Sequence, residues 1–400
     1  MENLTNLRTF MKNPISLLDE KFLNAKGDVQ NIKLGPKRFT LIFDPALAHE
    51  VLLSSDFEQN RTIFDRIKPI TGDKGLVQLN GKISSETREK FMPMFSPQNL
   101  GKMKEQILIN TEEALLDLKG KNEVDITSFM ADLVLRNAFK LFLGLDIKEE
   151  AKDMAEEFQE LNALCGEKMI SLFTLPLIVP TKKNRRIKYL RGSLRSKITI
   201  ALKGNNPDAV NIHKLFKNDE TLIDQCMTFL FAGHETTASS LAFTFLILGK
   251  HHDLRQRIVK GDDGLALMVY KESLRLYPPA YMLARQAVRD TLIGETPVKK
   301  GDQVLIGVKQ IHRHPRFHQS PEIFNPERFK ETNIAFLPFG AGPKSCIGEG
   351  LAYIEALTII RVFCKTFEFS TNQEEITSFP LVTLHPTAGQ YINLKEQVRG

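Results

Sequence analysis

The sequence contains no tryptophan and only four cysteines among 400 residues. The cysteines are Cys165, Cys226, Cys346 and Cys364, and none lies close enough to another to form a C-x-x-C zinc or redox pair. A disulfide scaffold is therefore excluded, and so few thiols in a long chain suggest a reducing compartment. If one cysteine has a function, it acts alone.

Long apolar segments are also lacking. The longest uncharged apolar stretch, Thr236–Gly249, is too short to cross a bilayer. The N-terminal segment 1–20 mixes five charged residues with scattered apolar ones, which is not the pattern of a signal peptide. We therefore expect no membrane anchor and a soluble, cytoplasmic protein.

The excess of positive charge is small, because 54 Lys and Arg residues against 48 Asp and Glu residues give a net charge of +6. The densest basic run, 182–197, has near-helical spacing, which is typical of a solvated helix face. A nucleic-acid-binding protein would concentrate its basic residues in a patch with interleaved aromatics. We therefore expect no nucleic-acid partner, whereas a basic surface can dock an acidic protein.

Composition and periodicity indicate a globular, mainly helical chain. The sequence is 42% hydrophobic and 26% charged, which excludes disorder. Apolar residues recur at spacings of three and four from 84 to 270, and a further helix is expected over 348–367. Short strands are expected over 31–43 and 281–310. Without a linker or repeat, the sequence predicts a single domain, 1–400, that is mostly α with a smaller β-rich portion (α+β).

The segment Phe336–Gly350 reads FLPFGAGPKSCIGEG and surrounds one of the cysteines with glycine. Gly340, Gly342 and Gly348 cost backbone entropy, and a tight loop that lets the sulfur of Cys346 approach a bulky planar ligand would explain them. Helical periodicity begins directly afterwards, so we expect the helix N-terminus to stabilise a thiolate. The alternative is a glycine-rich turn with an incidental cysteine.

This string resembles the haem-binding loop of the cytochrome P-450 family, F-x-x-G-x-[RH]-x-C-x-G. The matching positions are Phe339, Gly342, Cys346 and Gly348. The resemblance implies that Cys346 is the axial thiolate ligand of the iron of haem b, with Phe339 and Gly340 in the cofactor site. Lys344 stands where the family usually has Arg or His, and it offers a propionate a point charge rather than a fork.

A second segment, Phe231–Ser240, reads FAGHETTASS inside a long apolar helix candidate. An ionisable group such as Glu235 is costly there unless it has a partner or a function. Small residues followed by an acid and Thr236 suit a groove in which a small ligand lies against a helix. A buried helix whose glutamate reaches solvent is the alternative.

FAGHETTASS resembles the oxygen-activation motif of the same family, [AG]-G-x-[DE]-T-[TS], without departure. The resemblance implies that Thr236 and Glu235 are catalytic. Thr236 would steady the oxygen being activated, and Glu235 would relay protons to it through water. O2 is then a co-substrate, and the pair argues against the peroxide-using branch of the family.

The segment Tyr270–Pro279, YKESLRLYPP, places Glu272 and Arg275 on one helix face. Alone this spacing means little. Together with Arg328 in a downstream PERF segment, it resembles the family's Glu–Arg–Arg lock, and the resemblance implies a structural role for the three residues.

The resemblance also implies two cations at the haem propionates. Arg285 follows the double proline at the usual position. Arg88 lies in the segment 81–96, where the family has an aromatic or His four positions before an Arg. Here Arg88 is kept but Ser84 replaces the aromatic, which leaves the second contact open.

The resemblance covers nearly the whole chain and implies a cytochrome P-450 fold of the soluble bacterial type. It implies a haem-dependent monooxygenase that inserts one atom of O2 into a small apolar organic substrate. Electrons would come from an external partner, an acidic ferredoxin or flavodoxin with its reductase. A peroxide-driven hydroxylase of the same fold, an oxygen-independent isomerase and a non-catalytic haem carrier or sensor remain as alternatives. By family position, the residues expected near the substrate are Phe231, Ala232, Tyr281, Met282 and Ala388.

Overall fold

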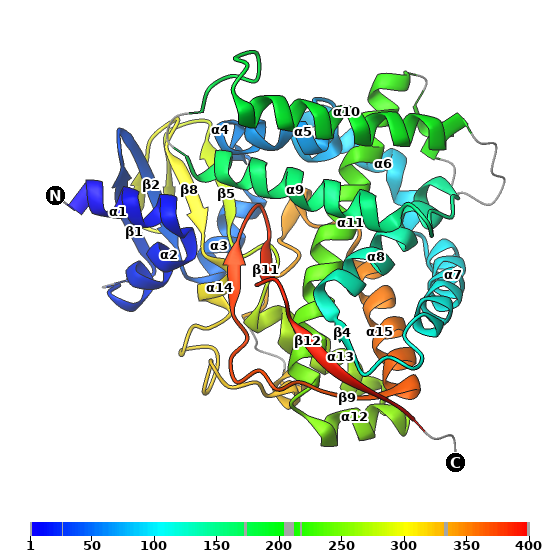
Figure 1. Ribbon diagram of the computed structural model, residues 1–400. Coiled ribbons are helices and arrows are strands. Elements are labelled where there is room, and N and C mark those ends of the chain that lie inside the picture. Colours follow the sequence, from blue (N-terminus) through cyan, green and yellow to red (C-terminus); the bar gives the residue numbers. More distant parts are fainter. Residues whose placement is uncertain are drawn as a thin grey trace.

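The computed structural model describes residues 2–25, 27–171, 174–203, 212–216, 218–331 and 335–397. Helices dominate these residues (Figure 1). The α-helices are α1 (Glu2–Lys12), α2 (Pro14–Leu23), α3 (Pro45–Leu53), α4 (Arg61–Phe64), α5 (Lys68–Thr71), α6 (Gly81–Phe91), α7 (Pro97–Leu116), α8 (Ile126–Leu143), α9 (Ala151–Ile170), α10 (Lys182–Lys203), α11 (Asp219–Leu248), α12 (His252–Val259), α13 (Asp263–Leu276), α14 (Val308–Ile311) and α15 (Glu349–Thr366).

The strands of the described residues form four small sheets. The largest has the order β1-β2-β8-β5-β3, in which β2 and β8 are parallel and the other pairs are antiparallel. A three-stranded sheet pairs β12 with β4 and β9, and the remaining pairs are β6–β7 and β10–β11. The strands are β1 (Val29–Leu34), β2 (Lys37–Ile42), β3 (Phe57–Gln59), β4 (Glu123–Asp125), β5 (Leu283–Ala287), β6 (Thr291–Ile293), β7 (Thr296–Val298), β8 (Gln303–Ile306), β9 (Phe367–Ser370), β10 (Ser378–Pro380), β11 (Leu384–Pro386) and β12 (Tyr391–Glu396).

Helix α11 runs through the middle of the molecule, with α8 and α15 on one side and the largest sheet on the other (Figure 1). Its first turn is capped by Asn218, whose side chain accepts a hydrogen bond from the backbone N–H of Thr221 at 2.9 Å. A helix that is apolar on all faces must be buried on all faces. The apolar run that is too short for a membrane is therefore the centre of the core.

The predicted class, mostly α with a smaller β-rich portion, is confirmed. The sequence did not predict α1 and α2 at the N-terminus. Tertiary contacts account for α1, because the amide of Asn3 donates to the carbonyl of Gly35 at 3.0 Å and accepts from its N–H at 2.9 Å. One apolar cluster contains side chains from Ile67 to Leu394, and the buried apolar side chains before Ile67 belong to smaller clusters. The single domain, 1–400, stays a prediction.

The basic run 182–197 lies on α10, which packs against α9. Arg186 bonds to Glu160 at 2.7 Å, and Lys197 pairs with Glu157 at 3.0 Å. Much of this positive charge is therefore offset by acids of the neighbouring helix. In the described part of the chain, no helix has the length and apolarity needed to cross a membrane.

Candidate functional site

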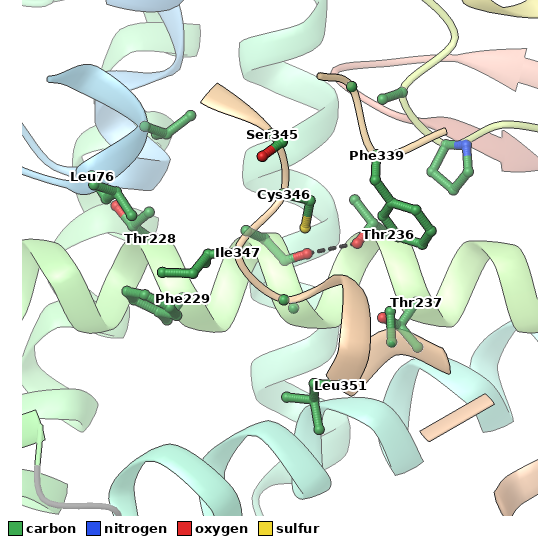
Figure 2. Close-up of a pocket in the computed structure, with 18 of the residues that line it drawn as sticks. Leu76, Thr228, Phe229, Thr236, Thr237, Phe339, Ser345, Cys346, Ile347 and Leu351 are labelled. Carbon is green, nitrogen blue, oxygen red and sulfur yellow. Dashed lines mark hydrogen bonds between the residues drawn. The ribbon is translucent and has the colours of Figure 1, made fainter. Parts of the chain in front are cut away.

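A cavity of about 350 Å³ lies between the middle of α11, the start of α15 and the loop that carries Cys346. Its walls are mostly apolar. Figure 2 shows Thr236 on the α11 wall and Cys346 on the loop wall of this cavity. The structure therefore brings together two motifs that are more than a hundred residues apart in the sequence.

Helix α11 forms one wall of the cavity, and the only three residues between Asp224 and Leu248 that are not buried lie in this wall. Ala232, Gly233 and Thr236 face the cavity there, on one side of the helix. The hydroxyl of Thr236 donates to the carbonyl of Ala232 at 2.7 Å, so the oxygen atom can still accept a hydrogen bond from a ligand.

The cysteine loop has the tight backbone that its glycines predict. Gly340 and Gly342 have φ values of 67° and 72°. A Cβ atom at Gly342 would lie 2.4 Å from the carbonyl oxygen of Leu52, so no larger residue fits. The N–H of Cys346 donates to the carbonyl of Phe339 at 2.9 Å, which closes the loop and turns the cysteine toward the cavity.

The expected stabilisation of a thiolate by the helix start is present at Cys346 but is outweighed by desolvation, even though the side chain is exposed to the cavity. Burial raises the pKa of Cys346, although the N–H of Gly348 and the charge of Arg88 act in the opposite direction. Helix α15 begins only at Glu349, so its N-terminus lies beyond the cysteine. The free side chain is therefore a thiol, and a bound metal ion would be needed to deprotonate it.

Three cations surround the cavity without a carboxylate partner among the described residues: Arg88, Arg285 and Lys344. Burial lowers the pKa of Arg285 to about 10. Burial, with the charges of Arg285 and Arg88, lowers the pKa of Lys344 to about 8. Arg285 is buried, and Arg88 and Lys344 are half-buried, so an anion bound in the cavity would stabilise all three charges.

The residues that depart from the family motifs contact each other. Lys344 donates to the hydroxyl of Ser84 at 2.8 Å and to the carbonyl of Leu79. Arg88 donates to the carbonyl of Ser345 at 2.9 Å. A serine at position 84 thus leaves room for the long side chain of Lys344. The two residues that differ from the family motifs therefore form one hydrogen-bonded pair.

These residues fit a haem. Its two propionates would satisfy the unpaired cations Arg88, Arg285 and Lys344, its apolar ring matches the cavity walls, and its iron would deprotonate the thiol of Cys346. No other cysteine and no histidine lines the cavity among the described residues.

The family model for cytochrome P-450 matches residues 2–261 and 265–392. The chain belongs to the cytochrome P-450 family. A similar curated protein is the cyclooctat-9-en-7-ol 5-monooxygenase of Streptomyces melanosporofaciens, 28% identical over 84% of this chain and 82% of that protein. A cytokinin hydroxylase of Arabidopsis thaliana is 27% identical over 86% of this chain and 78% of its own.

Two bacterial P-450 structures from Thermus thermophilus share the fold. CYP175A1 has a TM-score of 0.85 at 25% identity and covers 99% of this chain and 98% of its own. A six-coordinated cytochrome P-450 has a TM-score of 0.83 at 25% identity, over 96% of this chain and 98% of its own. The protein is an oxidoreductase of the haem-thiolate monooxygenase class, and the family implies haem, cysteine-thiolate ligation and O2.

In this P-450 the acid of the α11 motif turns away from the cavity. Glu235 is only 3% exposed and does not line the cavity. Its Oε2 atom accepts from the amide of Asn162 at 2.9 Å and lies 3.1 Å from Nε2 of His385. Neighbouring helix residues project about 100° apart, so Glu235 and Thr236 serve different faces of α11.

The three lock residues meet in the interior. Arg275 binds Glu272 through two hydrogen bonds of 2.7 and 2.8 Å. Arg328 of the 3-10 helix Pro326–Lys330 donates to the same carboxylate at 3.0 Å. The side chains of Glu272 and Arg275 are 0% exposed and that of Arg328 is 8% exposed, so the ion cluster is buried.

Of the five residues expected near the substrate, only Ala232 lines the cavity. Phe231 and Tyr281 are buried in the core, and the hydroxyl of Tyr281 donates to the carbonyl of Leu381 at 3.1 Å. Met282 lines a separate, smaller cavity near the N-terminal helix, and Ala388 is exposed. A contact between the substrate and these four residues therefore stays a prediction that the cavity lining does not support.

The sequence motifs do not identify Glu355 as a site residue, yet it lines the cavity from α15 and is 5% exposed. Its carboxyl accepts from the amide of Asn137 at 2.8 Å, and Asn137 in turn accepts from Asn110 at 2.9 Å. Burial raises the pKa of Glu355 to about 8. The signal was available, because Glu355 is an acid within the apolar face of a helix.

We expect Glu355 to make stability fall as the pH rises. Because its pKa is raised from 4.5 to about 8 in the folded protein, its stabilising contribution is complete below about pH 4.5 and is lost as the pH rises through about 8. Glu355→Gln keeps the bond to Asn137 and should remove this slope, a change of a few kcal/mol across the range. Urea unfolding at pH 5 to 9 measures it. The exposed Glu349→Gln is the control, and an unchanged slope in Glu355→Gln would contradict the assignment.

Proposed function

We propose that this enzyme inserts one atom of O2 into a small apolar organic substrate with electrons from a separate protein. The observation that supports the proposal is one cavity in which Cys346, Thr236 and three unpaired cations face apolar walls. A haem iron with a cysteine thiolate ligand supplies the chemistry that favours cleavage of the O–O bond.

The chain's own residues divide the work around the cofactor. Cys346 would hold the iron, and Arg88, Arg285 and Lys344 would hold the propionates. Each of these cations is positioned by a separate element, so together they would fix the cofactor's orientation. The apolar walls exclude bulk water from the reacting region.

The hydroxyl of Thr236 is the polar group of the α11 wall that we assign to oxygen activation. Its own hydrogen goes to the carbonyl of Ala232, which orients the lone pairs of Oγ1 toward the cavity. A water held by Oγ1 would receive the protons that the reaction consumes. Glu235, one residue earlier, is the acid that we assign to their supply.

Apolar side chains indicate the substrate class. The apolar cavity walls contributed by elements other than the cysteine loop include Phe64, Leu76, Val77, Phe229 and Leu283. The Streptomyces relative is named for a cyclic alcohol, and a compound of that class is a suitable first probe. Cyclooctat-9-en-7-ol, decanol and decane can be compared by the shift each causes in the Soret band of the haem-loaded protein. If none of the three compounds shifts the Soret band, the result would count against an apolar substrate.

Thr236→Ala should uncouple electron use from product formation. Without Oγ1 the water is not held and protons arrive in the wrong place, so we expect product per electron pair to fall roughly tenfold or more. The measurement uses a surrogate ferredoxin and reductase with the probe that shifts the Soret band most.

Thr244→Ala is the matched control for Thr236→Ala. Thr244 makes the same bond to the carbonyl four residues earlier, at 2.7 Å, but is buried and does not line the cavity. We expect wild-type coupling in this variant. Equal coupling in Thr236→Ala and the wild type would contradict the role of Thr236.

We further propose that the electron donor is an acidic ferredoxin or flavodoxin. Leu100 of α7 lies within contact distance of Gly350, so the start of α7 is beside the cysteine loop. Lys102 and Lys104 on α7 are exposed and have no ion pair among the described residues. These lysines suit an acidic partner surface.

Electron transfer from an acidic ferredoxin should slow steeply with salt, because screening weakens attraction between exposed charges. Reversing Lys102 and Lys104 to glutamate should slow it about tenfold at low salt and much less at high salt. Stopped-flow reduction of the haem measures the rate. Lys365→Glu, at the other end of α15, is the control. Reduction rates that change neither with salt nor with charge reversal at Lys102 and Lys104 would argue for another donor.

A further inference from the structure

One ring nitrogen lies at the centre of the polar cluster around Glu235. Nε2 of His385 is 3.1 Å from the carboxylate of Glu235, 2.7 Å from the hydroxyl of Thr383 and 3.2 Å from the amide nitrogen of Asn162. A ring nitrogen is either a donor or an acceptor. As a donor it bonds to the carboxylate. As an acceptor it faces the carboxylate with a lone pair and repels it.

His385 is held in place by the strand that carries it. The hydroxyl of Ser239 on α11 donates to the carbonyl of Leu384, and the N–H of Leu384 donates to the carbonyl of Pro279 at 2.9 Å. On the other side, a Cβ atom at Gly166 of α9 would lie 3.1 Å from the backbone of Leu381. The backbone from Leu381 to Leu384 is thus held between α9 and α11, which fixes where the side chain of His385 begins.

The charge on His385 decides the charge on Glu235. Burial alone would raise the pKa of Glu235, but the hydrogen bond and charge of His385, with the amide of Asn162, hold it below its usual value. The other titratable neighbour is His234 of α11. Burial lowers the pKa of His234, and a charge on its ring would, like that of His385, lower the pKa of Glu235. Among the described residues, His385 is the titratable side chain whose ring lies within hydrogen-bonding distance of the Glu235 carboxylate, so it is placed to keep this acid ionised and turned away.

We propose that His385 is the positioning residue of Glu235 and the source of the proton that Glu235 delivers. The inference rests on the function proposed above for Glu235. Transfer of the proton from Nε2 to Oε2 breaks one N–H bond, forms one O–H bond and leaves both side chains neutral, so the net charge of the pair is unchanged. The neutral acid has lost its ionic attraction to the ring. It can then rotate toward the α11 wall and give up the proton beside Thr236.

Infrared difference spectra test the first half of the proposal without turnover. In the haem-loaded wild type, Glu235 is ionised and contributes no carboxylic acid band. His385→Phe removes the hydrogen bond and the charge, so burial dominates and Glu235 should gain the C=O band of a protonated acid at neutral pH. The band should vanish in His385→Phe with Glu235→Gln. Thr383→Val keeps the ion pair and should show no new band. No gain in His385→Phe overturns the proposal.

Coupling tests the second half. We expect product per electron pair to fall about tenfold in His385→Phe, the magnitude of a lost proton-transfer step. His385→Gln keeps a donor toward Oε2 and the packing of β11, but it has no transferable proton. It should therefore be as uncoupled as His385→Phe, and the loss should not be relieved by changing the pH. If His385→Gln restores wild-type coupling, His385 is merely structural and the proposal is wrong.

Glu235→Gln separates this inference from the function on which it rests. If Glu235→Gln couples like the wild type, the proton role of Glu235 itself is wrong. If Glu235→Gln uncouples while His385→Phe gains no band and keeps its coupling, only the role of His385 is wrong.

Discussion

Replacing Cys346 with alanine should abolish the red-shifted Soret band that a thiolate-bound haem gives when reduced under carbon monoxide, and with it all monooxygenase activity. The described cavity lining contains no second cysteine and no histidine that could take over the iron. Without the thiolate, the electron density that favours O–O cleavage is lost. Absorbance spectra of the reduced protein with and without carbon monoxide measure the outcome.

The propionate contacts make this experiment specific. Arg88, Arg285 and Lys344 remain in Cys346→Ala, so we expect haem to be retained at reduced affinity and the protein to stay folded. Cys364→Ala is the matched control, because Cys364 is 1% exposed in the core and does not line the cavity. It should keep the band. A haem-loaded Cys346→Ala protein that still shows the red-shifted band would refute the assignment of the ligand.

The cysteine loop could be predicted because its chemistry is local. Gly340 and Gly342 predict a backbone with positive φ, and both residues have positive φ values in the structure. The direction of the pKa shift of Cys346 could not be predicted from the sequence, because desolvation by the whole fold outweighs the opposing N–H group of Gly348 at the helix start. The contact between Ser84 and Lys344 could not be predicted from the sequence either, because it joins residues 260 positions apart.

The same limit, between local features and contacts of distant residues, applies to the acid of the α11 motif. The sequence identified Glu235 as an acid in an apolar helix that needs a partner. It did not identify His385, which is 150 residues away and lies in a short strand with no periodic signal. Phe231 lies in the core while Ala232 lines the cavity, because one position along a helix is enough to turn a side chain to another face.

Removing one arginine from the buried lock should be among the most destabilising single changes in the chain. Arg275→Met leaves Glu272 buried with only Arg328 to compensate its charge. It also leaves the carbonyls of His312 and Pro321 without their donors, which now lie at 2.9 and 2.6 Å. Breaking a buried pair in this way costs about 3–5 kcal/mol. Urea unfolding followed by circular dichroism measures the free energy of unfolding.

The losses caused by the two single variants should overlap, because each variant removes the same two hydrogen bonds between Glu272 and Arg275. The double variant Arg275→Met with Glu272→Met should therefore be less destabilised than the sum of the two single variants, although it leaves Arg328 without its carboxylate. Arg186→Met is the surface control, because its pair with Glu160 is exposed and exposed pairs contribute only about 0–1 kcal/mol. Additive losses in the double variant would mean that Glu272 and Arg275 contribute separately. The lock would then be two anchors for the segment 312–323 and not one ion cluster.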